Sequence, residues 1–235
     1  MCGRYSITTA PEALRALFAF EEQPNLAPRF NVAPTQSVPV VRRDQEGRRR
    51  LSQLRWGLVP HWAKDLSIGA KMINARSETL AEKPSFRQAF ARRRCLLAAD
   101  GFYEWRAEQG PKAPKQPYRI EFPGRAPFAF AGLWERWGDR EEGTRIDSVT
   151  IITTAANETL KPLHHRMPVI LAPGDFEPWL DPEAEQPALQ ELLRPYPDKD
   201  GGYGDLSFYP VSTRLNKATN EEASLLDPLP PTNLL

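Results

Sequence analysis

The stretch Cys95-Leu96-Leu97-Ala98-Ala99-Asp100-Gly101-Phe102-Tyr103-Glu104-Trp105-Arg106 decides the fold of this chain. Its first five residues form a short apolar run, Asp100-Gly101 is a favourable turn, and the residues after the turn again suit a strand. Alternation along the second strand sends Tyr103 and Trp105 to one face and Phe102, Glu104 and Arg106 to the other. The stretch therefore predicts two successive strands, the second of which carries a carboxylate between aromatic residues.

Further strand-like runs lie on both sides of this stretch. They cover residues 38–43, 51–58, 118–122, 128–134, 146–153 and 206–211. The first two are joined across a charged turn at 44–47 and predict a hairpin. Because the strands do not alternate with long helices, a doubly wound parallel sheet is excluded. The expected fold class is α+β: a single domain with a curved, mostly antiparallel β-sheet or barrel-like core and several peripheral helices.

Helices are expected to be short, since 24 of the 235 residues are proline. The first begins near Pro11, with Thr9 and Glu12 spaced as a capping box. Others are predicted at 85–93, 173–180 and 183–193. We expect one domain over residues 1–225 and a Pro/Leu-rich C-terminal tail over 226–235, which is either a frayed end or a strap laid on the body.

The net charge of +1 conceals two opposite halves. Residues 1–120 hold 21 Lys and Arg against 11 Asp and Glu, whereas residues 121–235 hold 10 against 19. One interpretation is that the halves fold together and neutralise each other. The other is a polyanion-binding face built mainly from the first half.

Cys2 and Cys95 are too few for a disulfide framework or a zinc cluster. No apolar run approaches the length of a membrane span, and the N-terminus does not resemble a signal peptide. The glycine patterns of phosphate-binding and dinucleotide-binding loops do not occur, nor does H-E-x-x-H. We therefore expect a cytoplasmic protein with no cofactor, no bound metal and no membrane partner.

Cys2 follows the initiator methionine and becomes the first residue if Met1 is removed. Its α-amine and thiol would then form a 1,2-aminothiol, in which the reference pKa is about 8 for the amine and about 8.5 for the thiol. Such a group closes a five-membered thiazolidine on an aldehyde, by Schiff-base formation followed by thiol addition. Alternatively, the thiol attacks an acyl group with the amine as its base, or Cys2 is an inert N-terminal residue.

Four internal tracts suit chemistry or binding. In Met72–Glu78, extended geometry puts Asn74, Arg76 and Glu78 on one face, where an amide and a guanidinium suit a sugar and a phosphate. Burial of Glu104 among aromatics would raise its pKa and let it move protons near neutrality. The alternatives are a surface strand with a salt bridge and an exposed Glu104 paired to Arg106.

His164 and His165 stand side by side before Arg166. Adjacent side chains diverge in most backbone conformations, so we do not expect both histidines to ligate one metal. A single proton-handling histidine is the preferred interpretation. Arg55 to Lys64 interleaves tryptophans with basic residues, as in surfaces that stack bases and hold phosphates; the alternative is that the tryptophans are core and the arginines solvated.

Taken together, six motifs resemble the SRAP family of SOS-response-associated peptidase, or abasic-site processing, proteins. The match runs in order from Cys2 to about Leu180. The motifs are Met1-Cys2-Gly3-Arg4-Tyr5, Phe30-Asn31-Val32-Ala33-Pro34-Thr35, Arg55-Trp56-Gly57-Leu58-Val59-Pro60, Asn74-Ala75-Arg76-Ser77-Glu78, Asp100-Gly101-Phe102-Tyr103-Glu104-Trp105 and His164-His165-Arg166-Met167-Pro168.

The resemblance implies a DNA-damage sensor that binds single-stranded DNA at an abasic site and joins Cys2 to the ring-opened sugar as a thiazolidine. It would be a suicidal crosslinking enzyme with lyase-like Schiff-base chemistry, and we expect it to be a monomer. The implied catalytic residues are Cys2, Asn74, which orients the sugar, Glu104, the acid and base, and His164, which assists proton transfer or reversal. The residues implied to hold DNA are Arg4, Asn31, Pro34, Trp62, Arg76, Thr154 and Arg166.

The chain departs from some relatives in two places. Trp62-Ala63 stands where they carry two tryptophans as a base wedge, and Pro84 stands where others carry a phosphate-binding arginine. Two other functions stay open: a thiol peptidase that uses Cys2 and trims its own N-terminus, and a non-catalytic single-stranded nucleic-acid-binding module.

Overall fold

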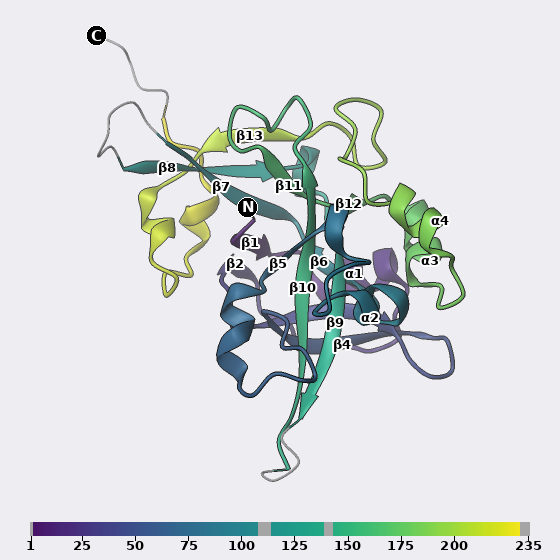
Figure 1. The fold of residues 1–235 in the computed structure, drawn as a ribbon. Coiled ribbons are helices and arrows are strands. Elements are labelled where there is room, and N and C mark those ends of the chain that lie inside the picture. The colour runs from purple at the N-terminus through teal and green to yellow at the C-terminus, as the bar shows by residue number, and fades with distance from the viewer. Residues whose placement is uncertain (1, 108–113, 139–142, 231–235) are drawn as a thin grey trace.

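The computed structural model describes residues 2–107, 114–138 and 143–230 as one α+β domain built on two sheets (Figure 1). The first sheet has five strands in the order β13-β8-β7-β1-β2. The second has the order β11-β10-β4-β3-β6-β9-β12, with β5 paired to β10. In chain order, the strands are β1 (Arg4–Ile7), β2 (Arg29–Val32), β3 (Ser37–Arg43), β4 (Arg49–Trp56), β5 (Asn74–Arg76), β6 (Arg94–Ala99), β7 (Gly101–Ala107), β8 (Lys115–Glu121), β9 (Phe128–Gly138), β10 (Arg145–Ala155), β11 (Arg166–Pro168), β12 (Ile170–Leu171) and β13 (Ser207–Pro210).

The second sheet closes on itself because β9 and β10 also pair with each other. The five strands β10, β4, β3, β6 and β9 therefore form a barrel. Its neighbours are antiparallel except for β10 and β4, which are parallel. The predicted barrel-like, mostly antiparallel core is confirmed.

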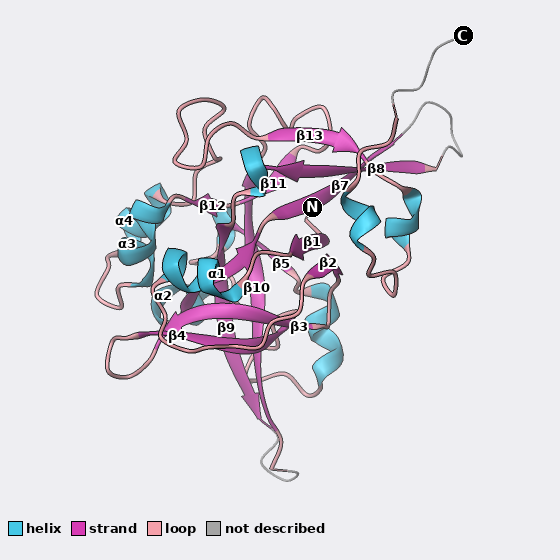
Figure 2. Cartoon of the chain, turned by 180° about the vertical axis from the view of Figure 1, so that it is seen from behind, coloured by secondary structure: helices cyan, strands magenta, loops and turns pink. Residues whose placement is uncertain are grey.

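Short helices cover the outside of the two sheets (Figure 2). The α-helices are α1 (Pro11–Phe18), α2 (Arg87–Arg92), α3 (Phe176–Leu180) and α4 (Gln186–Glu191). The 3₁₀ turns are η1 (Leu66–Lys71), η2 (Ser77–Thr79), η3 (Pro123–Arg125), η4 (Pro173–Asp175), η5 (Thr213–Asn216) and η6 (Ala223–Leu226). The predicted peripheral helices are confirmed, with α2 and α4 shorter than the sequence indicated.

The start of α1 differs from the prediction. Ala10 occupies the N-cap position and no side chain caps the helix. Thr9 instead donates to Asp100 through both its backbone amide, at 3.0 Å, and its hydroxyl, at 3.2 Å. The capping-box prediction is therefore wrong. The Thr9 hydroxyl satisfies the buried Asp100 carboxylate and does not cap the helix.

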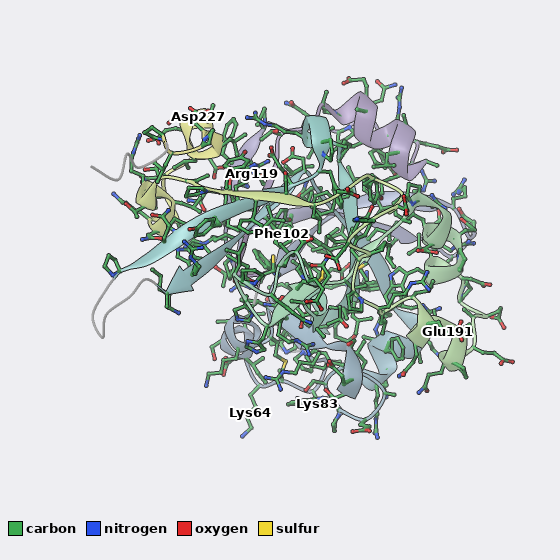
Figure 3. The ribbon with its side chains drawn as sticks, turned by 90° about the horizontal axis from the view of Figure 1, so that it is seen from above. Lys64, Lys83, Phe102, Arg119, Glu191 and Asp227 are labelled. Carbon is green, nitrogen blue, oxygen red and sulfur yellow. The ribbon has the colours of Figure 1, made fainter. Side chains whose placement is uncertain are left out.

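The deciding stretch crosses from one sheet to the other. β6 ends at Ala99 in the barrel, Asp100 follows, and β7 begins at Gly101 in the five-stranded sheet. Phe102 faces the main core, while Tyr103 packs with Leu215 in a second apolar cluster, so the predicted alternation is confirmed. Figure 3 shows Phe102 in the middle of the molecule, with Glu191 and Asp227 at its edges.

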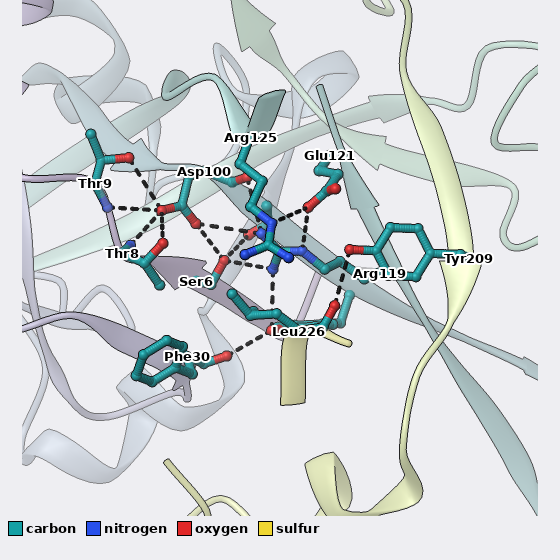
Figure 4. Close-up of polar contacts among 12 residues, drawn as sticks. Ser6, Thr8, Thr9, Phe30, Asp100, Arg119, Glu121, Arg125, Tyr209 and Leu226 are labelled. Atoms are coloured by element: carbon teal, nitrogen blue, oxygen red, sulfur yellow. Dashed lines mark hydrogen bonds and ion pairs between the residues drawn. The ribbon is translucent and has the colours of Figure 1, made fainter. Parts of the chain in front are cut away.

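Arg119 on β8 is fully buried and joins three strands of the five-stranded sheet (Figure 4). Its Nη1 donates to Ser6 Oγ on β1 at 2.8 Å and to Tyr103 Oη on β7 at 3.2 Å. Its Nε donates to Glu121 Oε2 at 2.6 Å. Ser6 passes the contact on by donating to Asp100 Oδ1 at 2.6 Å. Each donor in this network meets an acceptor, which is the condition for burying charge.

Gly101 makes room for this arginine. A Cβ at residue 101 would lie 2.5 Å from the Arg119 guanidinium carbon. Any larger residue would push the guanidinium away from Ser6 and Asp100. Gly101 therefore serves close packing as well as the change of sheet.

Residues 211–229, here called the C-terminal strap, lie across the five-stranded sheet. Val211 bridges to Pro228, and Leu229 donates its amide to the Pro210 carbonyl at 2.8 Å. Leu225 and Leu226 are buried against the Tyr103 cluster. The described part of the expected tail is thus a strap laid on the body. The domain boundary at residue 225 stays a prediction, and residues 231–235 lie outside the described residues.

We predict that Arg119→Ala lowers the free energy of unfolding by about 3–5 kcal/mol, because it leaves the Asp100 and Glu121 carboxylates without their buried cation. Chemical denaturation measures the change. Arg125→Ala is the matched control, since Arg125 lies 3.8 Å from the same Glu121 but is 48% exposed. The control should lose less than about 1 kcal/mol. Equal losses in the two variants would contradict a buried ionic network.

Candidate active site

Cys2 lies two residues before β1 and is completely buried. The Asn74 side-chain amide donates to the Cys2 carbonyl at 2.8 Å, so β5 fixes the backbone of the residue before it enters the sheet. The Cys2 thiol donates a long hydrogen bond of 3.7 Å to the Arg4 carbonyl. The structure thus brings together Cys2 and Asn74, which are 72 residues apart in the chain.

Glu104 on β7 belongs to the same site, because β7 pairs with β1 next to Cys2. Its side chain is buried, with 5% of the residue exposed, so the alternative of an exposed carboxylate is excluded. Burial raises the pKa of Glu104, opposed by the nearby charge of Lys115. Burial and then the Glu104 charge raise the pKa of the Cys2 thiol. Both groups therefore hold their protons more tightly than in water.

His164 precedes β11 and is partly buried. Its Nδ1 accepts the Arg166 amide hydrogen at 2.9 Å. Burial lowers the pKa of His164, and the charges of His165 and Lys115 act in the same direction. The neutral imidazole is therefore favoured near pH 7.

The rings of His164 and His165 do not diverge as expected but stack, with centroids 4.3 Å apart. The backbone between them follows a tight turn, in which Leu163 and His164 both donate to the Leu160 carbonyl. Within the described residues, no group of His, Cys, Asp and Glu could hold a metal ion.

Arg4 and Asn31, both predicted to hold DNA, contact the C-terminal strap in this structure. Arg4 Nη1 donates to Asn31 Oδ1 at 2.9 Å and to the Leu215 carbonyl at 3.0 Å. The buried Asn31 amide donates to the carbonyls of Leu215, Lys217 and Asn220 at 3.0–3.2 Å. In this structure, these two side chains tie β1 and β2 to the strap.

Other expected DNA-binding residues do reach the surface. Trp62 is 51% exposed, whereas Trp56 is fully buried, so the core interpretation holds for Trp56, while base stacking by Trp62 stays a prediction. Trp137 holds the Trp62 turn by donating Nε1 to the Ala63 carbonyl at 2.7 Å. Arg76, at the end of β5, is exposed. Pro34 is half-buried and precedes Thr35, a residue with a left-handed backbone.

Thr154 lies near the end of β10, and Arg166 begins the neighbouring strand β11. Thr154 is buried and pairs in register with Met167. Arg166 Nη1 and Nη2 lie 2.5 and 3.0 Å from the two Glu78 carboxylate oxygens, and Nη2 also donates to the Thr153 carbonyl. The predicted common face of Asn74, Arg76 and Glu78 is cut short, because the chain turns into η2 after Arg76.

Sequence reasoning missed two contributors to the site. The Tyr5 hydroxyl is buried without a hydrogen-bond partner among the described residues, and burial followed by the charge of Cys2 raises the pKa of Tyr5. Glu221 of the strap accepts the backbone amides of Phe30 and Asn31 at 2.5 and 2.9 Å. Tyr5 lies inside the N-terminal motif Met1–Tyr5, but no local sequence pattern links Glu221 to β2.

In the part of the chain that the structure describes, no helix is long and apolar enough to cross a membrane. The fold and the site together invite comparison with known proteins.

Residues 1–218 match the model of a protein family described as SOS response associated peptidase (SRAP). The chain is 43% identical over 231 residues to the abasic site processing protein YoaM of Bacillus subtilis, which covers 97% of this chain and 98% of that one. It is 33% identical to the abasic site processing protein HMCES of Gallus gallus, over 97% of this chain and 78% of that one.

The fold is also found in solved structures. A crystal structure of a protein from Bacteroides thetaiotaomicron superposes with a TM-score of 0.85 and 25% identity, over 97% of this chain and all of that one. The expected α+β architecture is therefore confirmed by an independent structure as well as by the topology described above.

We predict that Glu104→Gln speeds alkylation of the Cys2 thiol at pH 8 by roughly threefold to tenfold. The carboxylate charge raises the pKa of the thiol, so removing it lowers that pKa and increases the thiolate fraction. Mass spectrometry of the Cys2 peptide measures the rate separately from that of Cys95. Glu12→Gln, a change on α1, should leave the rate unchanged. Equal rates in all three proteins would mean that the Glu104 charge does not act on the thiol.

Proposed function

This chain belongs to the SRAP family, and from that premise we propose that it is an abasic-site sensor that binds single-stranded DNA. In this proposal Cys2, exposed as the first residue by removal of Met1, bonds covalently to the ring-opened abasic sugar. The resulting thiazolidine shields the lesion from other enzymes. The observation that carries the proposal is the burial of Cys2 beside Glu104, with its backbone held by Asn74.

The reaction proceeds in two balanced steps. The Cys2 α-amine attacks the sugar aldehyde and forms a carbinolamine, which loses its hydroxyl as water to give a protonated Schiff base. The Cys2 sulfur then adds to the carbon of the C=N bond, and the electron pair of that bond moves to nitrogen. The thiol proton leaves as the C–S bond forms, so the overall change is one aldehyde and one aminothiol converted to a thiazolidine and one water.

Glu104 supplies the acid and the base for these steps. Its raised pKa keeps a proton available for the departing hydroxyl. Once it has given up that proton, the carboxylate can accept the thiol proton in the second step. The raised pKa of the Cys2 thiol delays its ionisation until the positive Schiff base forms beside it.

Asn74 and His164 complete the catalytic group in this proposal. Asn74 keeps the Cys2 backbone in place and presents its amide to the sugar, since its side-chain oxygen is buried without a hydrogen-bond partner among the described residues. His164 is favoured as a neutral imidazole, so it can accept a proton during ring opening or during reversal of the crosslink.

The DNA strand would lie over the exposed Trp62 and Arg76. Trp62 offers a ring for base stacking, and Arg76 a guanidinium for a phosphate. Pro34 and Thr154 line the path, while Arg4, Asn31 and Arg166 support it from behind through the contacts they make in this structure. We expect no cofactor, a monomeric protein and a location on cytoplasmic DNA.

A thiol peptidase is the second candidate, favoured by the description of the family model. A peptidase nucleophile is usually a thiolate whose pKa has been lowered by a neighbouring base. Here burial and Glu104 move the pKa of Cys2 the other way. This argues for the aldehyde reaction, in which the α-amine attacks first.

We predict that protein lacking Met1 forms an adduct with a single strand carrying one abasic site, and that the adduct survives a denaturing gel. The same strand without the lesion should give none. Cys2→Ala should abolish the adduct, because without the thiol the α-amine gives only a Schiff base, which hydrolyses under denaturing conditions.

Protein that retains Met1 is the control for the chemistry, since an acylated Cys2 nitrogen cannot form a Schiff base. If it reacts as well as the trimmed protein, the thiazolidine mechanism is wrong. Cleavage of a peptide panel that is lost in Cys2→Ala, without any DNA adduct, would favour the peptidase. Salt-sensitive binding with no adduct would indicate a non-catalytic module.

We also predict that Glu104→Gln slows adduct formation by about 10²-fold or more while leaving affinity for the strand nearly unchanged. This change should slow the crosslink even though it makes the thiol more reactive toward an alkylating agent, because an amide cannot exchange the required protons. Single-turnover gels and fluorescence anisotropy measure the two quantities. Equal loss of both would mean that Glu104 is structural.

A further inference from the structure

The Glu78–Arg166 ion pair spans the end of β10. β5 and β11 both pair with this end, where Arg76 and Pro168 are each in register with Thr153. Glu78 follows β5 by two residues, and Arg166 begins β11. The two-point contact between the carboxylate and the guanidinium therefore links the two strands that flank β10.

Both linked strands carry a proposed catalytic residue. Asn74 opens β5 and binds the Cys2 carbonyl, four residues before Glu78. His164 accepts the Arg166 backbone amide at 2.9 Å, two residues before β11 proper. The ion pair is thus linked through β5 to Asn74, whose amide holds Cys2, and through the Arg166 backbone to His164.

Further hydrogen bonds hold the Arg166 guanidinium in place. Nη2 donates to the Thr153 carbonyl at 2.5 Å and lies 3.3 Å from the Thr153 hydroxyl. The Arg166 side chain is only 11% exposed, whereas that of Glu78 is 52% exposed. Arg166 lowers the pKa of Glu78, so the carboxylate stays charged near neutrality.

We propose that Glu78 is a positioning residue that clamps β5 to β11 through Arg166 and so fixes Asn74 and His164 relative to Cys2. The inference rests on the proposed function and extends it to a residue that touches none of the reacting atoms. A clamp is needed because β5 and β11 are three residues long, and each pairs with β10 over three positions. Small shifts of such strands displace reacting groups enough to slow a reaction.

The test compares Glu78→Gln with the unchanged protein, both lacking Met1, on a single strand with one abasic site. The rate of adduct formation at saturating DNA should fall by about tenfold or more. Affinity, measured in a Cys2→Ala background, should stay within about twofold. Glu78→Asp should restore part of the rate, and the charge swap Glu78→Arg with Arg166→Glu should recover more than either single change.

Glu177→Gln is the matched control, because Glu177 also binds arginines through both carboxylate oxygens and is 61% exposed, but it joins α3 to the β3–β4 hairpin. Its rate should equal that of the unchanged protein. An unchanged saturating rate in Glu78→Gln would overturn the proposal. So would a loss of affinity alone, or an equal slowing in the control.

The second readout is the NMR titration of His164, which needs no DNA. Release of β11 would admit water to the imidazole, so its lowered pKa should rise toward the ordinary value in Glu78→Gln. Loss of a negative charge alone would lower that pKa, so the sign separates movement from electrostatics. An unchanged or lower pKa would overturn the clamp. If the unchanged protein forms no adduct, the proposed function fails, while this titration still tests the clamp.

Discussion

The buried guanidinium of Arg119 is the constraint on which the site depends. It joins β1 through Ser6 and β7 through Tyr103, and those two strands carry Cys2 and Glu104 into the same buried place. A buried cation tolerates few geometries, because each of its donors must find an acceptor away from water. The same requirement that makes the network costly to disturb therefore holds Cys2 and Glu104 in a fixed arrangement.

Burial also sets the chemistry of the group. Cys2 and Glu104 are both removed from water, which raises the pKa of the thiol and of the carboxyl, while burial lowers the pKa of His164. A site in this state has little thiolate with which to attack peptides. It is consistent with the proposed reaction, in which the α-amine attacks the electrophile first.

Much of the fold could be predicted from local pattern. Cys95–Arg106 indicated both of its strands, and the alternation of Tyr103 against Phe102 was correct, because successive side chains of a strand point to opposite faces. Site residues such as Asn74 and Glu104 were found through motifs. Contacts between distant parts of the chain could not be predicted. The Thr9 hydroxyl donates to Asp100, and the Asn31 amide donates to carbonyls of the strap, but no local sequence pattern marks either pair. Only tertiary structure decides where such polar groups are satisfied.

The strap also affects the order in which parts of the protein can fold during synthesis. β1 begins at residue 4, yet its neighbours include the Leu215 carbonyl, close to the other end of the chain. During synthesis the first strand must wait until residue 215 has emerged before these surroundings are complete. Through that interval Cys2 is not yet buried, and closure of the fold afterwards removes it from the reach of other proteins. The removal of Met1 that the proposed function requires can therefore precede the burial of Cys2.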